Sequence, residues 1–204
     1  MKIHNVAQNS EEWLTLRAGR PTASNFKLLV TSKGARSKSL EGYALTLAGE
    51  KFAGKPLDAW EGNQWTERGH DLEDRAQELY DIVNDVTVEK VGFVTNGEAG
   101  CSPDSFVGEQ GLWEAKCLKA ENHIKALMRY EATGLAPPDY FQQAQGQMMV
   151  CERQWNDLTF YHPELPLLVV RILRDEKFIL ELRAAVDAVC AERERVLEIL
   201  KGIK

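Results

Sequence analysis

The stretches CSPD at residues 101–104 and EAKC at residues 114–117 decide the fold that this sequence predicts. Nine residues separate Asp104 from Glu114, and turn-forming residues lie between them, which is typical of adjacent strands joined by a tight connection. Because side chains alternate along a strand, Glu114 and Lys116 should project to the same face. We therefore expect the carboxylates of Asp104 and Glu114 to meet at the edge of this strand pair.

Two carboxylates beside a backbone carbonyl form a hard oxygen site suited to Mg²⁺ or Mn²⁺. The ligands would be Asp104, Glu114 and the backbone carbonyl of Ala115, whose side chain faces the core. Lys116 would lie beside a bound phosphate, where it orients or helps to deprotonate the attacking water and offsets transition-state charge. The motif alone leaves an alternative open, in which Pro-Asp begins a turn and the later charges decorate an exposed strand.

Periodicity in the rest of the chain predicts helices around these strands. Helical spacing or capping signals mark residues 9–17, a short segment from Thr22 or Ser24, and residues 40–52, 65–83, 120–130, 139–150 and 175–201. Strand patterns mark a three-stranded meander at 86–94, 100–107 and 112–118, and two later strands at 158–162 and 167–173. This order predicts an α/β or α+β fold with a central sheet flanked by helices.

Length and composition predict one domain. A chain of 204 residues that is 44% hydrophobic can bury one sizeable core, so we expect a single domain over residues 1–204. No apolar run approaches the roughly 20 residues of a membrane helix, and the N-terminus lacks a secretory pattern, so we expect a soluble, cytoplasmic protein. The four cysteines form no CxxC pair, which argues against a zinc ribbon, a disulfide framework or an iron–sulfur cluster.

The net charge of −6 is unfavourable for binding nucleic acid, since phosphate contacts require Lys and Arg. Bulk charge does not decide the matter, because a groove can be basic beneath an acidic surface. Residues 31–39 are small, polar and basic with no apolar period, which predicts a mobile loop. Its Lys33, Arg36 and Lys38 are candidates for contacts with a DNA backbone, although a solvated basic loop has the same composition.

Several motifs of this sequence closely resemble those of one family, that of the lambda exonuclease and the YqaJ viral recombinases. They also occur in the same order as in that family. The matching segments are 16–24 (its N-terminal phosphate motif), 68–73 (its acidic helix), 100–104 and 112–117 (its active-site strands) and 140–148 (its YxxQxQ helix). The resemblance covers about residues 13 to 150. It implies a restriction-endonuclease-like PD-(D/E)xK core built on a mixed β-sheet.

The resemblance also implies roles for individual residues. Arg17 would hold a 5′-terminal phosphate in bidentate fashion, and Ser24 and Ser102 would donate further hydrogen bonds to it. Glu73 would bind or orient a second metal ion through water, which implies two-metal hydrolysis. Gln143 would hydrogen-bond the nucleophilic water or the scissile phosphate. Each of these residues also has a plainer interpretation as a solvated or structural polar side chain.

By resemblance, this protein is a Mg²⁺-dependent exonuclease, with Mn²⁺ as a substitute and two ions per site. It would degrade duplex DNA from a 5′ phosphate, release 5′-mononucleotides and leave 3′ single-stranded overhangs for recombination by strand annealing. Family members form ring-shaped trimers around DNA and work beside a single-strand annealing protein, so we expect a homotrimer and such a partner, in a bacterial host or a phage-infected cell. Two alternatives remain: an endonuclease of the same fold, which would not need Arg17 and Ser24, and a non-catalytic DNA-binding or inhibitor protein.

Overall fold

The computed structural model describes residues 1–57 and 64–203, with side chains described for 1–57 and 72–203. The helices are α1 (Glu11–Arg17), α2 (Leu40–Ala53), α3 (Gln64–Asn84), α4 (Ala120–Thr133), α5 (Phe141–Cys151) and α6 (Glu176–Gly202), with 3₁₀ turns η1 (Ala23–Leu28) and η2 (Pro138–Tyr140). The strands are β1 (Lys2–His4), β2 (Glu89–Lys90), β3 (Phe93–Asn96), β4 (Ala99–Cys101), β5 (Ser105–Val107), β6 (Gly111–Cys117), β7 (Trp155–Tyr161) and β8 (Leu168–Leu173).

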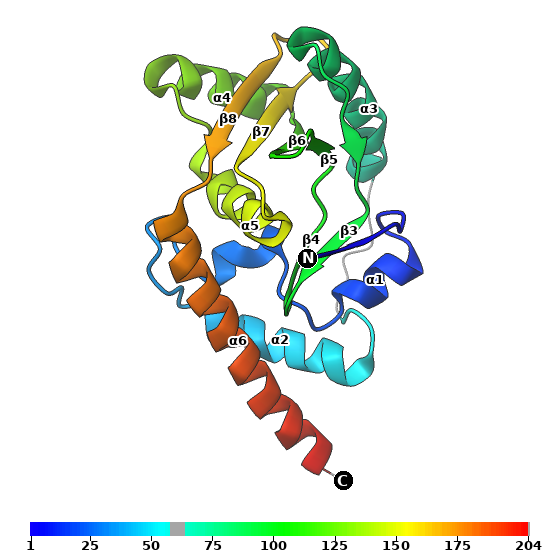
Figure 1. The fold of residues 1–204 in the computed structure, drawn as a ribbon, viewed down its shortest axis with the longest axis vertical. Coiled ribbons are helices and arrows are strands. Elements are labelled where there is room, and N and C mark those ends of the chain that lie inside the picture. The colour runs from blue at the N-terminus through cyan, green and yellow to red at the C-terminus, as the bar shows by residue number, and fades with distance from the viewer. Residues whose placement is uncertain (58–63, 204) are drawn as a thin grey trace.

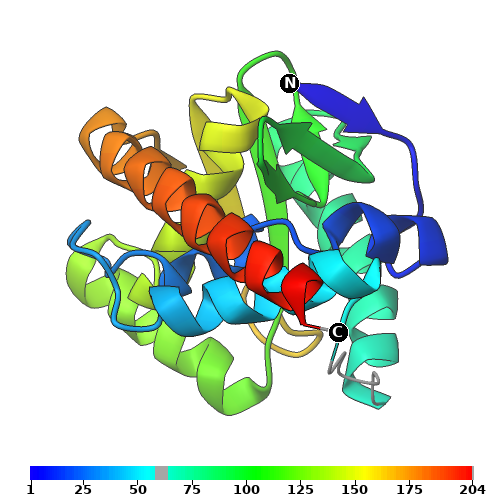
Figure 2. The same cartoon turned by 90° about the horizontal axis from the view of Figure 1, so that it is seen from below.

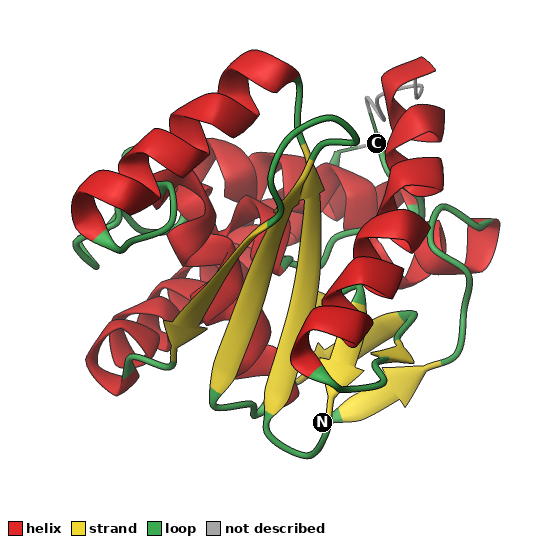
Figure 3. Ribbon diagram, turned by 90° about the horizontal axis from the view of Figure 1, so that it is seen from above, coloured by secondary structure: helices red, strands yellow, loops and turns green. Residues whose placement is uncertain are grey.

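A five-stranded mixed sheet forms the centre of the molecule, in the order β2-β5-β6-β7-β8 (Figures 1 and 3). Its β6 and β7 are parallel, and the other neighbours are antiparallel. The crossover between β6 and β7 consists of α4 and α5. On one face Tyr80 of α3 packs against Trp113, and on the other face Ala126 of α4 packs with Leu158 and Phe160. The prediction of an α+β fold with a mixed sheet flanked by helices is confirmed.

The predicted meander is present, but its first two strands are each broken in two. The outer halves, β3 and β4, pair with each other and with β1 in a separate three-stranded sheet, whereas β2 and β5 belong to the central sheet. Strand β1 was not predicted from the sequence. A Cβ at Gly92 would lie 2.4 Å from the Val6 carbonyl oxygen, so only glycine lets the segment after β1 approach this break. Residues 102–104 form the matching break.

Two helices of the C-terminal half, α5 and α6, pack against elements of the N-terminal segment. Helices α2 and α6 lie side by side (Figure 2), and η1 packs against α5. Asp175 caps α6 by accepting the Phe178 N–H at 3.0 Å, which satisfies one of the free donors of the first turn. Among the described residues, no helix combines the length and the apolar character needed to cross a membrane.

Two Gly→Ala substitutions in helices are expected to change the stability of the protein in opposite directions. One is at Gly146, where α5 packs against η1, and the other is at Gly42 of α2. Alanine normally stabilises a helix interior by roughly 0.5–1 kcal/mol relative to glycine. At Gly146, however, a Cβ would lie 2.3 Å from the buried Phe26 ring, and such overpacking costs about 1–3 kcal/mol. We expect Gly146→Ala to destabilise the protein and Gly42→Ala, which meets nothing within 4 Å, to stabilise it slightly. Urea unfolding of both variants measures this, and equal shifts would contradict the packing argument.

Candidate active site

The structure brings the two predicted carboxylates together at the end of the β5–β6 ladder. That ladder ends with Ser105 opposite Trp113, so Asp104 lies just beyond it. The Asp104 carboxylate accepts the backbone N–H of Ala115 at 2.7 Å. The aspartate is therefore fixed beside β6 by the same strand that carries Glu114.

The backbone of Ala115 lies on the side of β6 that faces Asp104. The ladder between β5 and β6 ends at the pair Ser105 and Trp113, and two residues further along β6 the Ala115 N–H donates to the Asp104 carboxylate. Because the N–H and C=O of one strand residue point to the same side, the Ala115 carbonyl is directed to the side of Asp104. It is therefore a candidate third oxygen ligand.

Glu114 is almost fully buried, and three side chains donate hydrogen bonds to its carboxylate. Its Oε1 accepts from Lys116 Nζ at 2.7 Å and from Gln143 Nε2 at 2.8 Å, and its Oε2 accepts from Gln147 Nε2 at 2.7 Å. Asn156 of β7 donates to the Gln147 carbonyl oxygen at 2.7 Å, which orients that amide toward Glu114. Sequence reasoning missed Gln147, although it lies one helical turn after Gln143 and therefore on the same face of α5.

Negative charge accumulates around Asp104. Burial raises its pKa well above the usual range, and the charges of Glu114 and Glu73 add to this effect. Glu73 and Asp104 both line a cavity of about 500 Å³. Burial likewise raises the pKa of Cys117 to about 12, with contributions from Glu73 and Asp104. Buried like charges repel one another unless a cation neutralises them.

The donor set fits a divalent cation of the Mg²⁺ type. No three His, Cys, Asp or Glu side chains are grouped as a ready metal cage within the described part of the chain. Mg²⁺ does not require such a cage, since it keeps several waters and binds through one or two carboxylates plus substrate phosphate. Asp104, Glu114 and the Ala115 carbonyl provide that partial set.

Lys116 carries a positive charge at this site. Burial alone would lower its pKa, but the neighbouring Glu114 and Asp104 carboxylates outweigh burial and raise the pKa. The Tyr140 ring lies beneath the ammonium group, 5.3 Å from its centroid. This favours Lys116 as a hydrogen-bond donor and counter-charge over a resting general base.

The raised pKa of Asp104 predicts how stability depends on pH without metal. Between the ordinary aspartate range and the raised pKa, the unfolded chain releases a proton that the folded protein retains, so stability falls as pH rises through this window. Asp104→Asn removes this effect and still accepts the Ala115 N–H. In EDTA at alkaline pH we expect the variant to melt above the wild type, with the difference fading at acid pH.

Thermal unfolding across pH tests this expectation, with the exposed Asp187→Asn as the matched control. Added Mg²⁺ should raise the melting temperature of the wild type and of the control but not that of Asp104→Asn. A variant less stable than the wild type throughout would show that Asp104 is a stabilising structural carboxylate.

A second group of predicted residues lines a cavity of about 230 Å³ that Asp104 and Glu114 also line. Arg17, Ser24 and Ser102 all line it, with Gln143 and Gln147 on the side of the carboxylates. The predicted phosphate residues thus share one space with Asp104 and Glu114, whereas Glu73 lines the neighbouring cavity.

Trp13 of α1 organises this cavity. Its indole N–H donates to Ser102 Oγ at 2.8 Å, and the Arg17 guanidinium lies over its ring at 4.2 Å. Arg17 also reaches Thr22 Oγ1 at 3.5 Å, which in turn lies 3.3 Å from Ser24 Oγ. Burial lowers the pKa of Arg17, and no carboxylate of the described residues forms an ion pair with it. A desolvated cation of this kind favours an anionic ligand.

The remaining predicted residues lie apart or outside the described region. Lys33 lines a different cavity, against α6, and Arg36 and Lys38 are exposed in the same loop. None of the three lines either cavity that contains Asp104. Arg68 and Gly69, part of the acidic-helix motif, lie outside the residues whose side chains are described.

Comparison with known proteins gives one family and a consistent set of structures. The YqaJ-like viral recombinase domain matches residues 12–154. The chain is similar to an alkaline exonuclease from Laribacter hongkongensis, at 34% identity over 94% of this chain and 96% of that chain with a TM-score of 0.81. The same exonuclease in complex with dAMP gives 33% identity, the same coverage and the same TM-score.

A phage-related exonuclease from Haemophilus somnus 129PT shares 17% identity over 89% of this chain and 96% of that chain, with a TM-score of 0.70. At that identity the similarity is one of fold alone. A comparison with curated protein sequences gives no significant match.

Proposed function

The chain belongs to the YqaJ-like viral recombinase family, and from this membership we propose that it is a Mg²⁺-dependent exonuclease acting on duplex DNA in the 5′-to-3′ direction. The family and the PD-(D/E)xK type of fold are as the sequence predicts. The Laribacter hongkongensis relative is described as an alkaline exonuclease, which supports a nuclease role here.

One observation carries the proposal: the carboxylates and the Arg17 group share one small cavity. Asp104 and Glu114 line it together with Arg17, Ser24 and Ser102. A space of about 230 Å³ suits a terminal nucleotide better than a strand that passes through. An enzyme that cuts within a strand would not require an anion site beside its carboxylates. A strand that ends in this cavity, in contrast, presents its terminal phosphate to Arg17.

The residues of the chain then have distinct tasks. Asp104, Glu114 and the Ala115 carbonyl would hold Mg²⁺, or Mn²⁺ in its place, and Glu73 would hold a second ion through water. When bound, the metal would polarise the scissile phosphate and make a bound water more acidic. Lys116 donates to the phosphate oxygens and offsets their growing charge. Gln143, already in contact with Glu114 at 2.8 Å, is placed to hold the attacking water.

Hydrolysis that breaks the bond between phosphorus and the 3′ oxygen of the terminal nucleotide has a useful consequence. The released product is a 5′-mononucleotide with a 3′ hydroxyl. The phosphate stays on the shortened strand as its new 5′ terminus. Each cut therefore regenerates the anion that Arg17 recognises, so one site can serve successive cuts and leave a 3′ overhang for strand annealing.

The expected partners follow from the family. We propose that the protein works as a homotrimeric ring on DNA, beside a single-strand annealing protein, in a bacterial host or a phage-infected cell. A ring would reconcile binding to DNA with the net charge of −6, because enclosure replaces part of the electrostatic attraction.

The proposal is tested with one plasmid in two forms, closed circular and linearised with 5′-phosphorylated ends, incubated with Mg²⁺ or EDTA. We expect acid-soluble mononucleotides from the linear form with Mg²⁺ only, and an intact circle. Cleavage of the circle would replace the proposal with an endonuclease. No cleavage of either form with Mg²⁺ or Mn²⁺ would favour a non-catalytic protein.

A further inference from the structure

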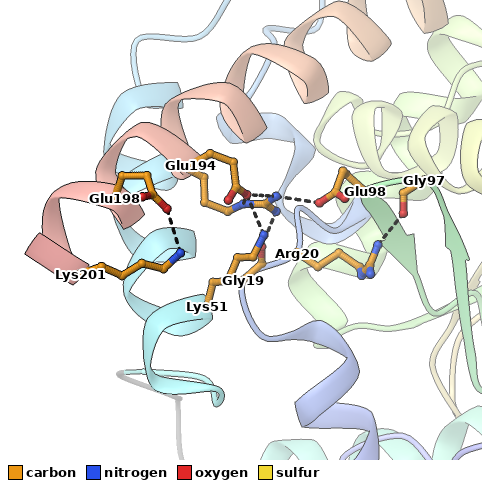
Figure 4. A network of polar contacts seen from close by, with 9 residues as sticks. Gly19, Arg20, Lys51, Gly97, Glu98, Glu194, Glu198 and Lys201 are labelled. Atoms are coloured by element: carbon orange, nitrogen blue, oxygen red, sulfur yellow. Dashed lines mark hydrogen bonds and ion pairs between the residues drawn. The ribbon is translucent and has the colours of Figure 1, made fainter.

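Arg193 of the C-terminal helix α6 is a buried cation far along the sequence from every motif of the site. Its side chain is only 3% exposed. Its Nη1 donates to the Gly19 carbonyl at 2.7 Å, and its Nη2 donates to Glu98 at 2.7 Å and Glu194 at 2.5 Å. Figure 4 shows Gly19, Lys51, Glu98 and Glu194 gathered at this point. Burying a charge costs free energy that an apolar side chain would not cost. The buried Arg193 therefore suggests a role other than stability alone.

Arg193 holds the turn at Gly19. This turn connects Arg17 to Ser24, and both of these residues line the cavity of about 230 Å³. Gly19 follows Arg17 by two residues and precedes Ser24 by five. Arg193 itself does not line the cavity. Any effect of Arg193 on the bound phosphate must therefore act through the backbone of this turn.

Both polar groups of Gly19 are held from outside the turn. Glu50 of α2 accepts its N–H at 2.9 Å, and Arg193 of α6 donates to its C=O at 2.7 Å. Gly19 has φ +69°, and a Cβ there would lie 2.6 Å from Lys51 Cβ. A residue with a side chain therefore cannot replace Gly19 unless the backbone or Lys51 moves. Two helices that pack side by side thus hold both backbone groups of one residue.

Beyond Gly19 the chain is joined to the β3–β4 hairpin. Arg20 donates to the Gly97 carbonyl at 2.7 Å, and Gly100 donates to the Pro21 carbonyl at 3.0 Å. A bridge between Thr22 and Gly100 follows. The hairpin carries Glu98, the other partner of Arg193, so one guanidinium connects the turn, the hairpin and α6.

We propose that Arg193 is a positioning residue for recognition of the 5′-terminal phosphate, acting through the Gly19 peptide on Arg17 and Ser24. This inference rests on the proposed function, because it presupposes a phosphate between those two residues. Loss of these contacts with Gly19 would let the turn shift and spread the two groups that hold the anion. Recognition of the end would weaken, while the Asp104–Glu114 centre, held by β5, β6 and α5, would remain intact.

The test compares kcat and KM on linear duplexes that carry either a 5′ phosphate or a 5′ hydroxyl. For Arg193→Met we expect KM on phosphorylated ends to rise about tenfold, as for loss of a charged hydrogen bond, with kcat at saturation nearly unchanged and KM on hydroxyl ends unaffected. Arg193→Lys, which keeps one donor for Gly19, should be intermediate. Arg195→Met is the matched control, because Arg195 is exposed and pairs with Glu192 on the same helix.

Two further variants keep the outcomes distinct. Glu50→Ala releases the Gly19 N–H without removing a buried cation, so it should raise the same KM even if Arg193→Met fails to fold. Arg17→Met tests the underlying function directly. If Arg17→Met leaves the preference for phosphorylated ends unchanged, the phosphate site itself is wrong. Suppose instead that Arg17→Met abolishes the preference, while folded Arg193→Met and Glu50→Ala keep the wild-type ratio of KM on phosphorylated ends to KM on hydroxyl ends. Then only the positioning role of Arg193 is overturned.

Discussion

Substitution of Lys116 by methionine is expected to lower the single-turnover rate of DNA hydrolysis by about 10³-fold, in line with the loss of one donor aimed at a transition-state oxyanion. Lys116 lies 2.7 Å from Glu114, and both are largely buried, so no solvent cation can replace the ammonium in position. Binding of DNA should change little, because the lost interaction strengthens only in the transition state.

Lys119→Met is the matched control for this prediction, since Lys119 is an exposed lysine immediately before α4. It should keep wild-type single-turnover kinetics. A Lys116→Met enzyme that retains more than a tenth of the wild-type rate would remove Lys116 from the chemistry and leave it as a structural partner of Glu114.

Substitution of Arg17 by methionine is expected to remove the preference for 5′-phosphorylated over 5′-hydroxyl ends, a change on the order of 100-fold in the ratio of kcat/KM. Arg17 is half-buried and its guanidinium lies over the Trp13 ring, where a phosphate would be its principal counter-charge. Arg17→Lys keeps the charge without the fork of donors, so we expect an intermediate ratio.

The stability of this variant provides an independent check. Because burial of the Arg17 charge lowers its pKa, the cation is unfavourable in the free protein. Arg17→Met should therefore fold with equal or greater thermal stability, while losing end recognition. Marked destabilisation would indicate instead that Arg17 mainly holds α1 to the fold.

The sequence was sufficient to predict that Asp104, Glu114 and Lys116 lie together, because the signals for their placement are local. Glu114 and Lys116 lie on β6, and Asp104 immediately precedes β5, which a short turn joins to β6. Strand alternation alone predicts that Glu114 and Lys116 share a face. The segments of regular helix, including α2, α4 and α6, were also predicted to within a few residues, since capping residues and apolar spacing mark them.

What could not be predicted depends on contacts between distant segments. The short strand β1 has no periodicity of its own and forms only because β3 offers it an edge. Gln147 is one of several glutamines in α5, and only its contacts with Glu114 and Asn156 distinguish it from the others. Arg193 lies in an ordinary charged helix until the fold sets Gly19 beside it.

The most direct test of the central claim uses a linear duplex with only one 5′ end phosphorylated and a different label in each strand. In Mg²⁺ we predict that the first labelled products are 5′-mononucleotides from the phosphorylated strand, released in order from its 5′ terminus. Release from a 3′ end, or of internal oligonucleotides, would contradict the assignment of Arg17, Ser24 and Ser102 to the terminal phosphate.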